Sequence, residues 1–279
     1  MHQTINCRGQ LLSLKQPLVM GILNVTEDSF YDGGRYFGDE RKYIAHVEKM
    51  LSEGADIIDV GVMSTRPNAI ELSEEEECKR MQEVLSHLIR HFPKTIFSID
   101  TWRSSVARQA IDRGASIIND VSGGTFDEKM FQTIASLKVP YILMHTSGKP
   151  EVMQQKTEYK EVVKDIYDYL SQRLQLLYDL NVCDVIVDPG FGFGKSIDQN
   201  YELLRNIELF RLLDCPIVVA VSRKSMFWKY LQVTPEEALA ATTAAHTYAL
   251  LHGANLLRVH DVKAAKDAIQ VVAKLMNKE

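Results

Sequence analysis

The chain has 279 residues, of which 46% are hydrophobic and 25% are charged, so it is long enough to bury the core of one large domain. The formal net charge is -5 and no Lys/Arg cluster stands out, which argues against nucleic acid and anionic membranes as partners. No apolar run reaches the ~18 residues of a membrane span, no secretory signal is apparent, and the four cysteines lack the spacing of a zinc site, so we expect a cytoplasmic protein.

Residues 1–17 precede the first expected strand and predict a hairpin or plug across the bottom of the fold. Eight short runs rich in β-branched residues follow, with helical stretches between them. The runs are residues 18–24, 56–61, 95–100, 116–120, 139–145, 184–188, 216–221 and 255–260. This alternation predicts an α/β protein with one domain over residues 1–279, a (β/α)8 TIM barrel.

Each of these runs ends at a polar side chain rather than at a turn residue. The endings are Asn24, Asp59, Asp100, Asn119, His145, Asp188, Ser222 to Lys224 and Arg258 to His260. TIM barrels carry their chemistry at the carboxyl ends of the strands, where an unpaired buried carboxylate is costly. The acids are therefore expected to pair with one of three partners: metal ions, a flat heterocycle rich in N–H groups, or cationic side chains of the protein itself. Their spread around the rim favours the heterocycle, because a hard metal ion needs several close oxygens.

Capping signals and loop lengths outline the segments between the strands. Residues 73–76 form a capping box that begins a helix running to about His91, and residues 234–237 form a second one. The segments 24–38 and 61–72 are long for strand-to-helix connections. We expect both to overhang the catalytic face as lids or binding loops.

The last strand carries a candidate anion site. Arg258 and His260 are two residues apart, so both side chains lie on one face of the strand. Asp261 is in place to cap the helix that follows, and a helix N-terminus beside Arg and His favours phosphate. Arg66, on the loop after the second strand, is a second candidate donor to the same anion.

Two further segments suggest a flat ligand. Residues 188–196 superficially resemble a phosphate-binding P-loop, but Pro189 stands where that motif needs glycine. The glycines instead allow close backbone approach to a ligand, with Phe193 as a wall. Lys224 follows the seventh strand, where it either forms a Schiff base or donates a hydrogen bond, and the residues alone do not separate these roles.

Together the motifs resemble those of the dihydropteroate synthase family, from Met20 to about Val262. They are MGILNVTEDSF (20–30), STRPNA (64–69), SIDT (98–101), IIND (117–120), MHTSGKPEVMQ (144–154), DPGFGFGK (188–195), VSRKS (221–225) and RVHD (258–261). The resemblance implies a transferase of folate biosynthesis and a sulfonamide target. It would couple 4-aminobenzoate to 6-hydroxymethyl-7,8-dihydropterin diphosphate with Mg2+, releasing diphosphate by way of a pterin cation.

The resemblance also implies roles for particular residues. Those expected to hold the pterin are Asp100, Asn119, Met144, Asp188, Phe193 and Lys224. Those expected to face the diphosphate are Asn24, Arg66, Arg258 and His260, with Asn24 also a Mg2+ ligand. Those expected to form the 4-aminobenzoate pocket are Phe30, Thr65, Pro67 and Ser225. The catalytic set is then Asp100, Lys224, Arg258 and His260.

The sequence departs from the family pattern in the two long loops. Glu27 replaces a usual proline, Val62 and Met63 replace Gly-Glu, and Asn68 replaces glycine. Three alternatives stay open: a pterin-binding methyltransferase domain, a catalytically silent paralogue, and a Schiff-base aldolase that uses Lys224. A homodimer is expected from the resemblance, and the helical periodicity near 235–252 and 261–275 permits the exposed apolar faces it needs.

Overall fold

The computed structural model describes residues 4–26, 39–63, 71–155 and 157–277. Its strands are β1 (Thr4–Cys7), β2 (Gln10–Ser13), β3 (Leu18–Asn24), β4 (Ile57–Gly61), β5 (Ile96–Asp100), β6 (Ile117–Asp120), β7 (Tyr141–Met144), β8 (Val185–Asp188), β9 (Val218–Val219) and β10 (Leu256–Val259). Its α-helices are α1 (Glu40–Ser52), α2 (Glu74–His91), α3 (Ser104–Arg113), α4 (Met130–Leu137), α5 (Val162–Asp179), α6 (Ile197–Arg205), α7 (Ser225–Leu231), α8 (Leu239–Leu251) and α9 (Val262–Leu275). Three 3₁₀ turns are η1 (Met153–Gln155), η2 (Ile207–Leu213) and η3 (Glu236–Ala238).

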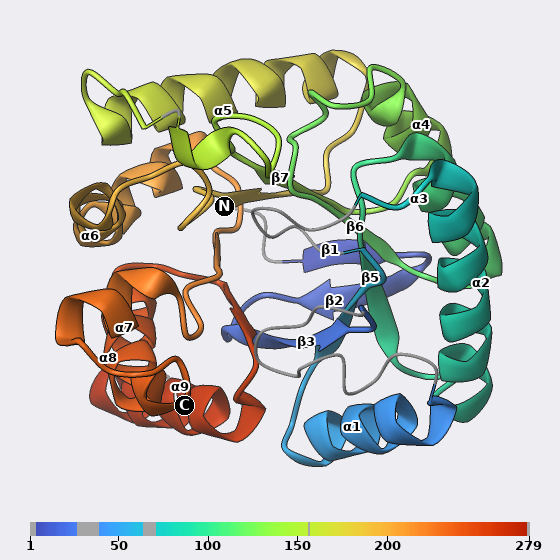
Figure 1. The fold of residues 1–279 in the computed structure, drawn as a ribbon, viewed down its shortest axis with the longest axis horizontal. Helices are drawn as coiled ribbons and strands as arrows, with labels where there is room; N and C mark the ends of the chain where they lie inside the picture. Colours follow the sequence, from blue (N-terminus) through green and yellow to red (C-terminus); the bar gives the residue numbers. More distant parts are fainter. Residues whose placement is uncertain (1–3, 27–38, 64–70, 156, 278–279) are drawn as a thin grey trace.

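Strands β3 to β10 form one parallel sheet that closes into a barrel. Their order is β8-β7-β6-β5-β4-β3-β10-β9, and a parallel bridge between Val187 and Ile217 joins the two ends. The helices form a ring outside the strands (Figure 1). The expected TIM barrel is therefore confirmed, although β9 is shorter than the predicted strand over residues 216–221.

Successive side chains of each strand point alternately into and out of the barrel. The outward set packs against the helices; it includes Leu23, Ile58, Val60, Ile99, Ile118, Leu143, Val187, Val219 and Leu257. The inward set begins with an apolar layer of one residue from each strand, namely Met20, Ile57, Ile96, Ile117, Ile142, Ile186, Val218 and Leu256. Because both faces are buried, the strands read as continuous apolar runs.

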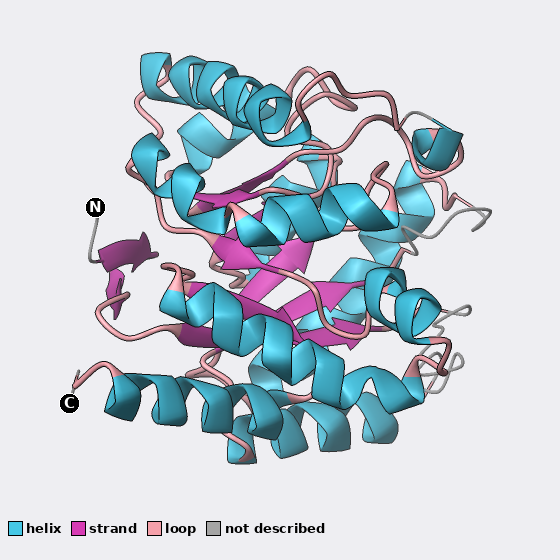
Figure 2. Cartoon of the chain, turned by 90° about the vertical axis from the view of Figure 1, so that its left-hand side faces the viewer, coloured by secondary structure: helices cyan, strands magenta, loops and turns pink. Residues whose placement is uncertain are grey.

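The N-terminal hairpin closes the lower end of the barrel. Strands β1 and β2 pair antiparallel, and Ile5, Cys7 and Leu14 pack against the apolar inward layer. Figure 2 shows the hairpin at one end of the barrel, near the C-terminal end of α9. The expected hairpin over residues 1–17 is confirmed within the described residues, and its apolar face seals the core from water.

The expected helix starts are borne out in part. Ser73 caps α2, since its Oγ accepts a hydrogen bond from the Glu76 N–H at 3.2 Å. The backbone N–H of Thr234 donates to Glu237 Oε2 at 2.9 Å, but the turn that follows is the 3₁₀ turn η3 and α8 begins only at Leu239.

Among the described residues no helix is both long and apolar enough to cross a membrane.

Candidate active site

The polar residues of the site come from the inward faces of the strands, above the apolar layer. Moving two residues along the strand from that layer reaches Asp59, Ser98, Asn119, Met144, Asp188 and Arg258 on six of the eight strands, and Ile22 and Ala220 on the other two. Two residues further lie Asn24, Asp100, Ser222 and His260. The barrel therefore changes from an apolar floor to a polar interior at one level, so side chains far apart in the sequence share one space.

Arg258 on β10 reaches past β3 and joins β4 and β5 at this level. Its Nε donates to Asp59 Oδ2 at 2.6 Å and its Nη2 donates to Asp100 Oδ2 at 2.9 Å. The amide Nδ2 of Asn119 donates to the same Asp59 oxygen at 2.9 Å. The Asn119 amide is thereby oriented, with its oxygen left as an acceptor for a ligand.

Asp188 and Lys224 face the same interior from the far side of the barrel. Asp188 Oδ1 accepts a hydrogen bond from the Gly190 N–H at 2.7 Å. Lys224 donates from Nζ to the carbonyl of Phe191, and its Nζ lies 4.6 Å from the centre of the Phe193 ring. Burial raises the pKa of Asp188, and the charges of Lys224 and Arg258 work against that rise, so the two halves of the site act on one another.

Burial moves the pKa values of Asp100 and Lys224 toward neutral pH. It raises the pKa of Asp100 to about 7, against the opposing charge of Arg258. It lowers the pKa of Lys224 to about 8, against the opposing charge of Asp188. Burial also works against the charge of Arg258, but Asp59 and Asp100 outweigh it and raise the Arg258 pKa. Such shifts are typical of functional sites.

His260 faces the same interior as a neutral side chain. Burial and the neighbouring Arg258 lower the pKa of His260 to about 3, so the imidazole is neutral. Ser222 Oγ accepts from the His260 backbone N–H at 3.2 Å and lies 3.1 Å from Nδ1. If the Ser222 hydroxyl donates to Nδ1, the ring proton sits on Nε2, and His260 offers an N–H donor in place of a charge.

Asp261 occupies the N-cap position of α9 without a side-chain capping bond, which corrects the expected cap. Its carboxylate instead forms a two-pronged ion pair with Arg223, at 2.7 Å to Nε and 2.9 Å to Nη2. Arg223 itself has a left-handed backbone with φ 51. The pair joins the loops after β9 and β10, which carry Lys224 and His260.

An apolar wall borders the polar interior at the ends of β5, β6 and β7. Met144 belongs to a buried cluster with Met63, Trp102 and Val121, against which Phe193 packs. A flat aromatic ligand needs such surfaces for its faces while its edges bind polar groups. Met63 replaces a residue that is polar in the family pattern, and here it contributes to this wall.

Several predicted residues lie outside the described part of the chain. These are Phe30, Thr65, Arg66 and Pro67, together with the departures Glu27 and Asn68. Of the predicted 4-aminobenzoate residues, Ser225 is described, and it begins α7 directly after Lys224. Val62 is buried in the main core, so this departure from the family pattern supports the barrel wall.

Asn24 is the only predicted metal ligand. A methyl group placed on Gly61 would lie 3.4 Å from Asn24 Oδ1 and 3.8 Å from Asp100 Oδ2, so both oxygens border one small space. The described residues contain no cluster of three or more His, Cys, Asp or Glu side chains arranged to hold a metal. One amide oxygen fits Mg2+, which commonly keeps several waters and takes other ligands from phosphate.

Three residues of the site carry roles that the sequence analysis did not assign. Asp59 orients both Arg258 and Asn119, Ser222 orients His260, and Lys195 is buried beneath the loop after β8. Asp59 is among the polar strand endings of the sequence, and period two along β4 places it on the inward face, but its role as an orienting group depends on partners from other strands. No sequence pattern predicts that the side chain of Lys195 turns back under this loop.

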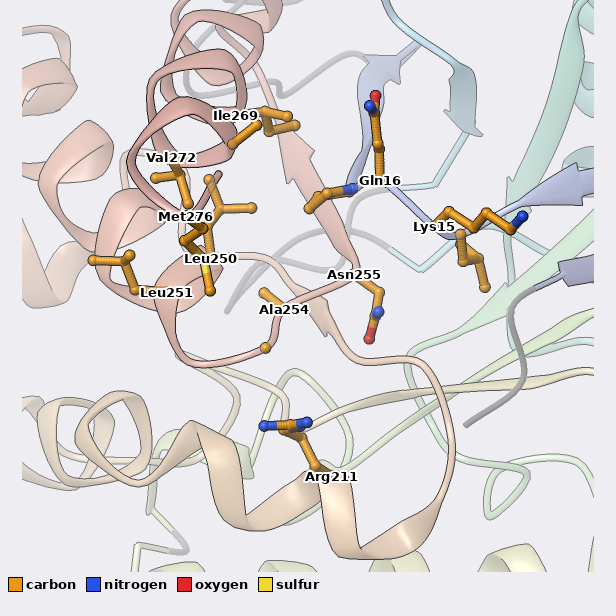
Figure 3. A pocket seen from close by; sticks show the side chains of 14 residues that line it. Lys15, Gln16, Arg211, Leu250, Leu251, Ala254, Asn255, Ile269, Val272 and Met276 are labelled. Atoms are coloured by element: carbon orange, nitrogen blue, oxygen red, sulfur yellow. The ribbon is translucent and has the colours of Figure 1, made fainter. Parts of the chain in front are cut away.

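A cavity of about 590 Å³ lies away from this site, at the hairpin end of the barrel (Figure 3). Leu250, Ile269, Val272 and Met276 line it, with Arg211 at its edge. None of the predicted site residues borders it. The polar barrel interior is therefore the candidate active site, and this cavity is separate from it.

Comparison with known proteins identifies relatives that match almost the whole chain. The family model described as pterin binding enzyme matches residues 20–260. A dihydropteroate synthase of Streptococcus pyogenes serotype M1 is 41% identical over 262 residues, which cover 92% of this chain and 95% of the relative. The chain superimposes on the Yersinia pestis dihydropteroate synthase in a sulfonamide drug complex with a TM-score of 0.93, at 35% identity over 98% of this chain and 99% of that one. The Xanthomonas albilineans dihydropteroate synthase with 4-aminobenzoic acid gives a TM-score of 0.90, at 35% identity over 99% of each chain.

Proposed function

The chain belongs to the pterin-binding enzyme family that includes the dihydropteroate synthases, and from this premise we propose the reaction that it catalyses. It is a transferase that joins 4-aminobenzoate to 6-hydroxymethyl-7,8-dihydropterin diphosphate, giving 7,8-dihydropteroate and diphosphate. The observation that supports this proposal most directly is the polar interior of the barrel. There Asp188 and Lys224 face the hydrogen-bonded network of Arg258, Asp59 and Asn119. The hydrogen-bond acceptors and donors in this interior complement the donors and acceptors that alternate along the edge of a pterin ring.

Pterin recognition follows from the orientation of these groups. The Asp188 carboxylate accepts from a ring N–H and the exocyclic amine, and the Asn119 oxygen and Asp100 bind the opposite edge. Lys224 donates one N–H to the Phe191 carbonyl and has two further N–H groups for the ring oxygen and nitrogen. Met144 and Phe193 pack on the two faces of the ring. Buried polar groups of this kind reject analogues that leave them unpaired.

Bond cleavage separates charge between the two levels of the site. The bond between the hydroxymethyl carbon and its oxygen breaks, and both electrons leave with diphosphate. Arg258, with Nε and Nη2 already bound to carboxylates, offers its remaining N–H groups to that anion, and His260 adds a neutral donor. Arg66 is proposed as a further donor. Positive charge develops on the pterin near Asp100, and preorganised opposite charge stabilises it.

Mg2+ is part of the proposal, with Asn24 as its protein ligand. When bound, the ion stabilises negative charge on the diphosphate without transferring a proton. The space beside Gly61, which Asn24 Oδ1 and Asp100 Oδ2 both border, supports this position.

The second substrate completes the reaction at the mouth of the barrel. The amine nitrogen of 4-aminobenzoate gives its lone pair to the pterin carbon. The arylammonium formed is acidic enough to pass its proton to the departing diphosphate or to water, so no strong base is required. We propose Ser225 for this pocket because it follows Lys224 at the start of α7. Phe30, Thr65 and Pro67 are proposed for the same pocket from the family motifs, and sulfonamides would compete there.

We further propose that residues 1–279 form one domain, that the protein acts in the cytoplasm, and that it is a homodimer. The barrel elements run from Leu18 to Leu275, and the hairpin packs on them. Exposed apolar side chains on the last two helices support a dimer surface; they are Leu239, Leu251, Val271 and Leu275.

The reaction is tested by measuring diphosphate release with both substrates and identifying dihydropteroate as the product. The wild-type chain should require 4-aminobenzoate, and Asp188→Asn should lose pterin affinity. Methyl transfer from a reduced folate without diphosphate release would favour a methyltransferase. Failure to rescue a strain that lacks dihydropteroate synthase would favour a silent paralogue. Borohydride trapping of a carbonyl substrate on Lys224 would favour an aldolase.

A further inference from the structure

Lys195 is a buried lysine that the proposed reaction does not use. Its side chain is 4% exposed and turns back under the loop that follows β8. Its Nζ donates to the Gly190 carbonyl at 2.7 Å and to the Phe193 carbonyl at 3.0 Å. His145 contributes two more acceptors, Nδ1 at 3.0 Å and its backbone carbonyl at 3.4 Å. One ammonium group therefore ties together the loops after β7 and β8.

His145 is held as an acceptor for this ammonium group. An ammonium has donors but no acceptor, so His145 Nδ1 must present a lone pair and the ring must be neutral. Burial, followed by the charge of Lys195, lowers the pKa of His145 to about 2, which agrees with this state. The rings of Tyr169 and Tyr159 lie 4.8 Å and 5.9 Å from the imidazole and restrict its rotation.

The loop that Lys195 holds sets three of the groups proposed to bind the pterin. The Gly190 N–H bonds to the Asp188 carboxylate, the Phe191 carbonyl accepts from Lys224, and Phe193 supplies a ring. Gly190 has φ +72, and a Cβ there would lie 1.9 Å from the His145 carbonyl oxygen. The loop after β8 therefore lies directly against the loop after β7, at a separation that Lys195 fixes.

Lys195 also acts on Asp188 through its charge. Burial raises the pKa of Asp188, and Lys195 is among the cations that lower it. Burial also lowers the pKa of Lys195 well below its ordinary value, and the Asp188 carboxylate works against that shift, so each charged form stabilises the other. A buried positive charge near a carboxylate favours the ionised form, which is the better acceptor for pterin N–H groups. The loop contacts of Lys195 and its positive charge thus both favour an Asp188 carboxylate that is oriented and ionised for the pterin.

We infer that Lys195, held by His145, is a positioning residue that prepares the loop 190–193 and the Asp188 carboxylate for the pterin base. The inference rests on the proposed function, since it assigns a ligand to the same site. It predicts selectivity: losing Lys195 should impair binding of the pterin and spare 4-aminobenzoate, because the hydrogen bonds of Lys195 go to His145, Gly190 and Phe193 and not to Ser225.

The test uses Lys195→Met, which keeps the length of the side chain and removes its donors and charge. Binding of 6-hydroxymethylpterin is measured by titration calorimetry, and steady-state kinetics give a Michaelis constant for each substrate. We expect pterin affinity to fall about 10- to 100-fold, as for loss of charge-assisted hydrogen bonds, while the Michaelis constant for the amine substrate stays unchanged. His145→Asn, which places an amide oxygen near the Nδ1 position, should lose less pterin affinity than His145→Leu.

Lys266→Met is the matched control. Lys266 donates to Asp56 Oδ2 at 2.6 Å, ahead of β4 at the hairpin end of the barrel. This variant should lower thermal stability and leave pterin binding intact. Wild-type pterin affinity in Lys195→Met would overturn the inference, as would equal losses for both substrates.

If Lys195→Met does not fold, His145→Leu decides in its place. A selective loss of pterin binding in that variant supports the inference, and wild-type binding contradicts it. Because calorimetry with 6-hydroxymethylpterin needs no turnover, a wild-type chain that binds this pterin but forms no dihydropteroate would contradict the proposed function alone.

Discussion

Lys224 loses its proton at lower pH than an ordinary lysine. Its pKa is lowered to about 8, chiefly by burial, so the ammonium donor disappears as pH rises through 8. Pterin affinity should therefore decline above pH 8, approaching a loss of about tenfold per pH unit. Calorimetric titration with 6-hydroxymethylpterin between pH 7 and 10 measures this decline.

Lys224→Gln separates this effect from titration of the pterin itself. The variant should bind more weakly and show a shallower decline, because its amide does not ionise. An identical decline in wild type and Lys224→Gln would assign the pH dependence to another group.

Asp59 is buried behind the groups that it orients, and its Oδ2 accepts from both Arg258 and Asn119. Asp59→Asn keeps the shape and removes the charge, so Arg258 loses one ionic partner and the Asn119 amide loses its fixed orientation. We expect pterin affinity to fall about tenfold, as for loss of one charge-assisted hydrogen bond. Unchanged calorimetric affinity would show that Asp59 is dispensable for orientation.

At the level of elements, the hairpin β1–β2 supplies the floor of the barrel. Ile5 is 1% exposed and packs on the apolar inward layer, whereas Leu11 on the neighbouring strand is 69% exposed. Ile5→Ala should lower the free energy of unfolding by about 2–5 kcal/mol, and Leu11→Ala should change it little. Urea denaturation of both variants measures the difference.

The hairpin lies at the opposite end of the barrel from the polar level. Folded Ile5→Ala enzyme should therefore keep the wild-type kcat and the wild-type Michaelis constants of both substrates at a temperature where it stays folded. A specific loss of pterin affinity in this variant would mean that the floor and the site are coupled.

At the scale of the whole molecule, α9 exposes apolar side chains on its outer surface. Val271 is 58% exposed and Leu275 is 68% exposed, more than a helix packed only inward requires. Large exposed apolar areas are typical of interfaces. In the proposed homodimer, Val271→Glu would bury a carboxylate, so sedimentation equilibrium should show a shift toward monomer.

Leu176→Glu on α5 is the control for that experiment. Leu176 is 46% exposed, and Figure 1 places α5 and α9 on opposite sides of the barrel. This variant should sediment as the wild type does. A monomeric wild-type chain, or equal dissociation by both variants, would contradict a dimer through α9.

Much of the architecture could be predicted from local patterns. Continuous β-branched runs ending in polar residues indicate parallel strands with both faces buried, and a period of two separates inward from outward side chains. Asp100, Asn119, Asp188 and Arg258 were identified in this way. The motifs of the resembling family added the substrate class, which the pattern of acids alone left open.

The sequence by itself determined the eight strands, the faces of their side chains and the family to which the chain belongs. The tertiary structure decided which charges meet: Arg258 bonds to Asp59, 199 positions away, and Lys195 reaches His145, 50 positions away. It also decided that His260 is neutral and that Asp261 pairs with Arg223. Local patterns encode how a segment folds and which side it buries, whereas partners and pKa values depend on closure of the barrel, which sets distance and exposure to water.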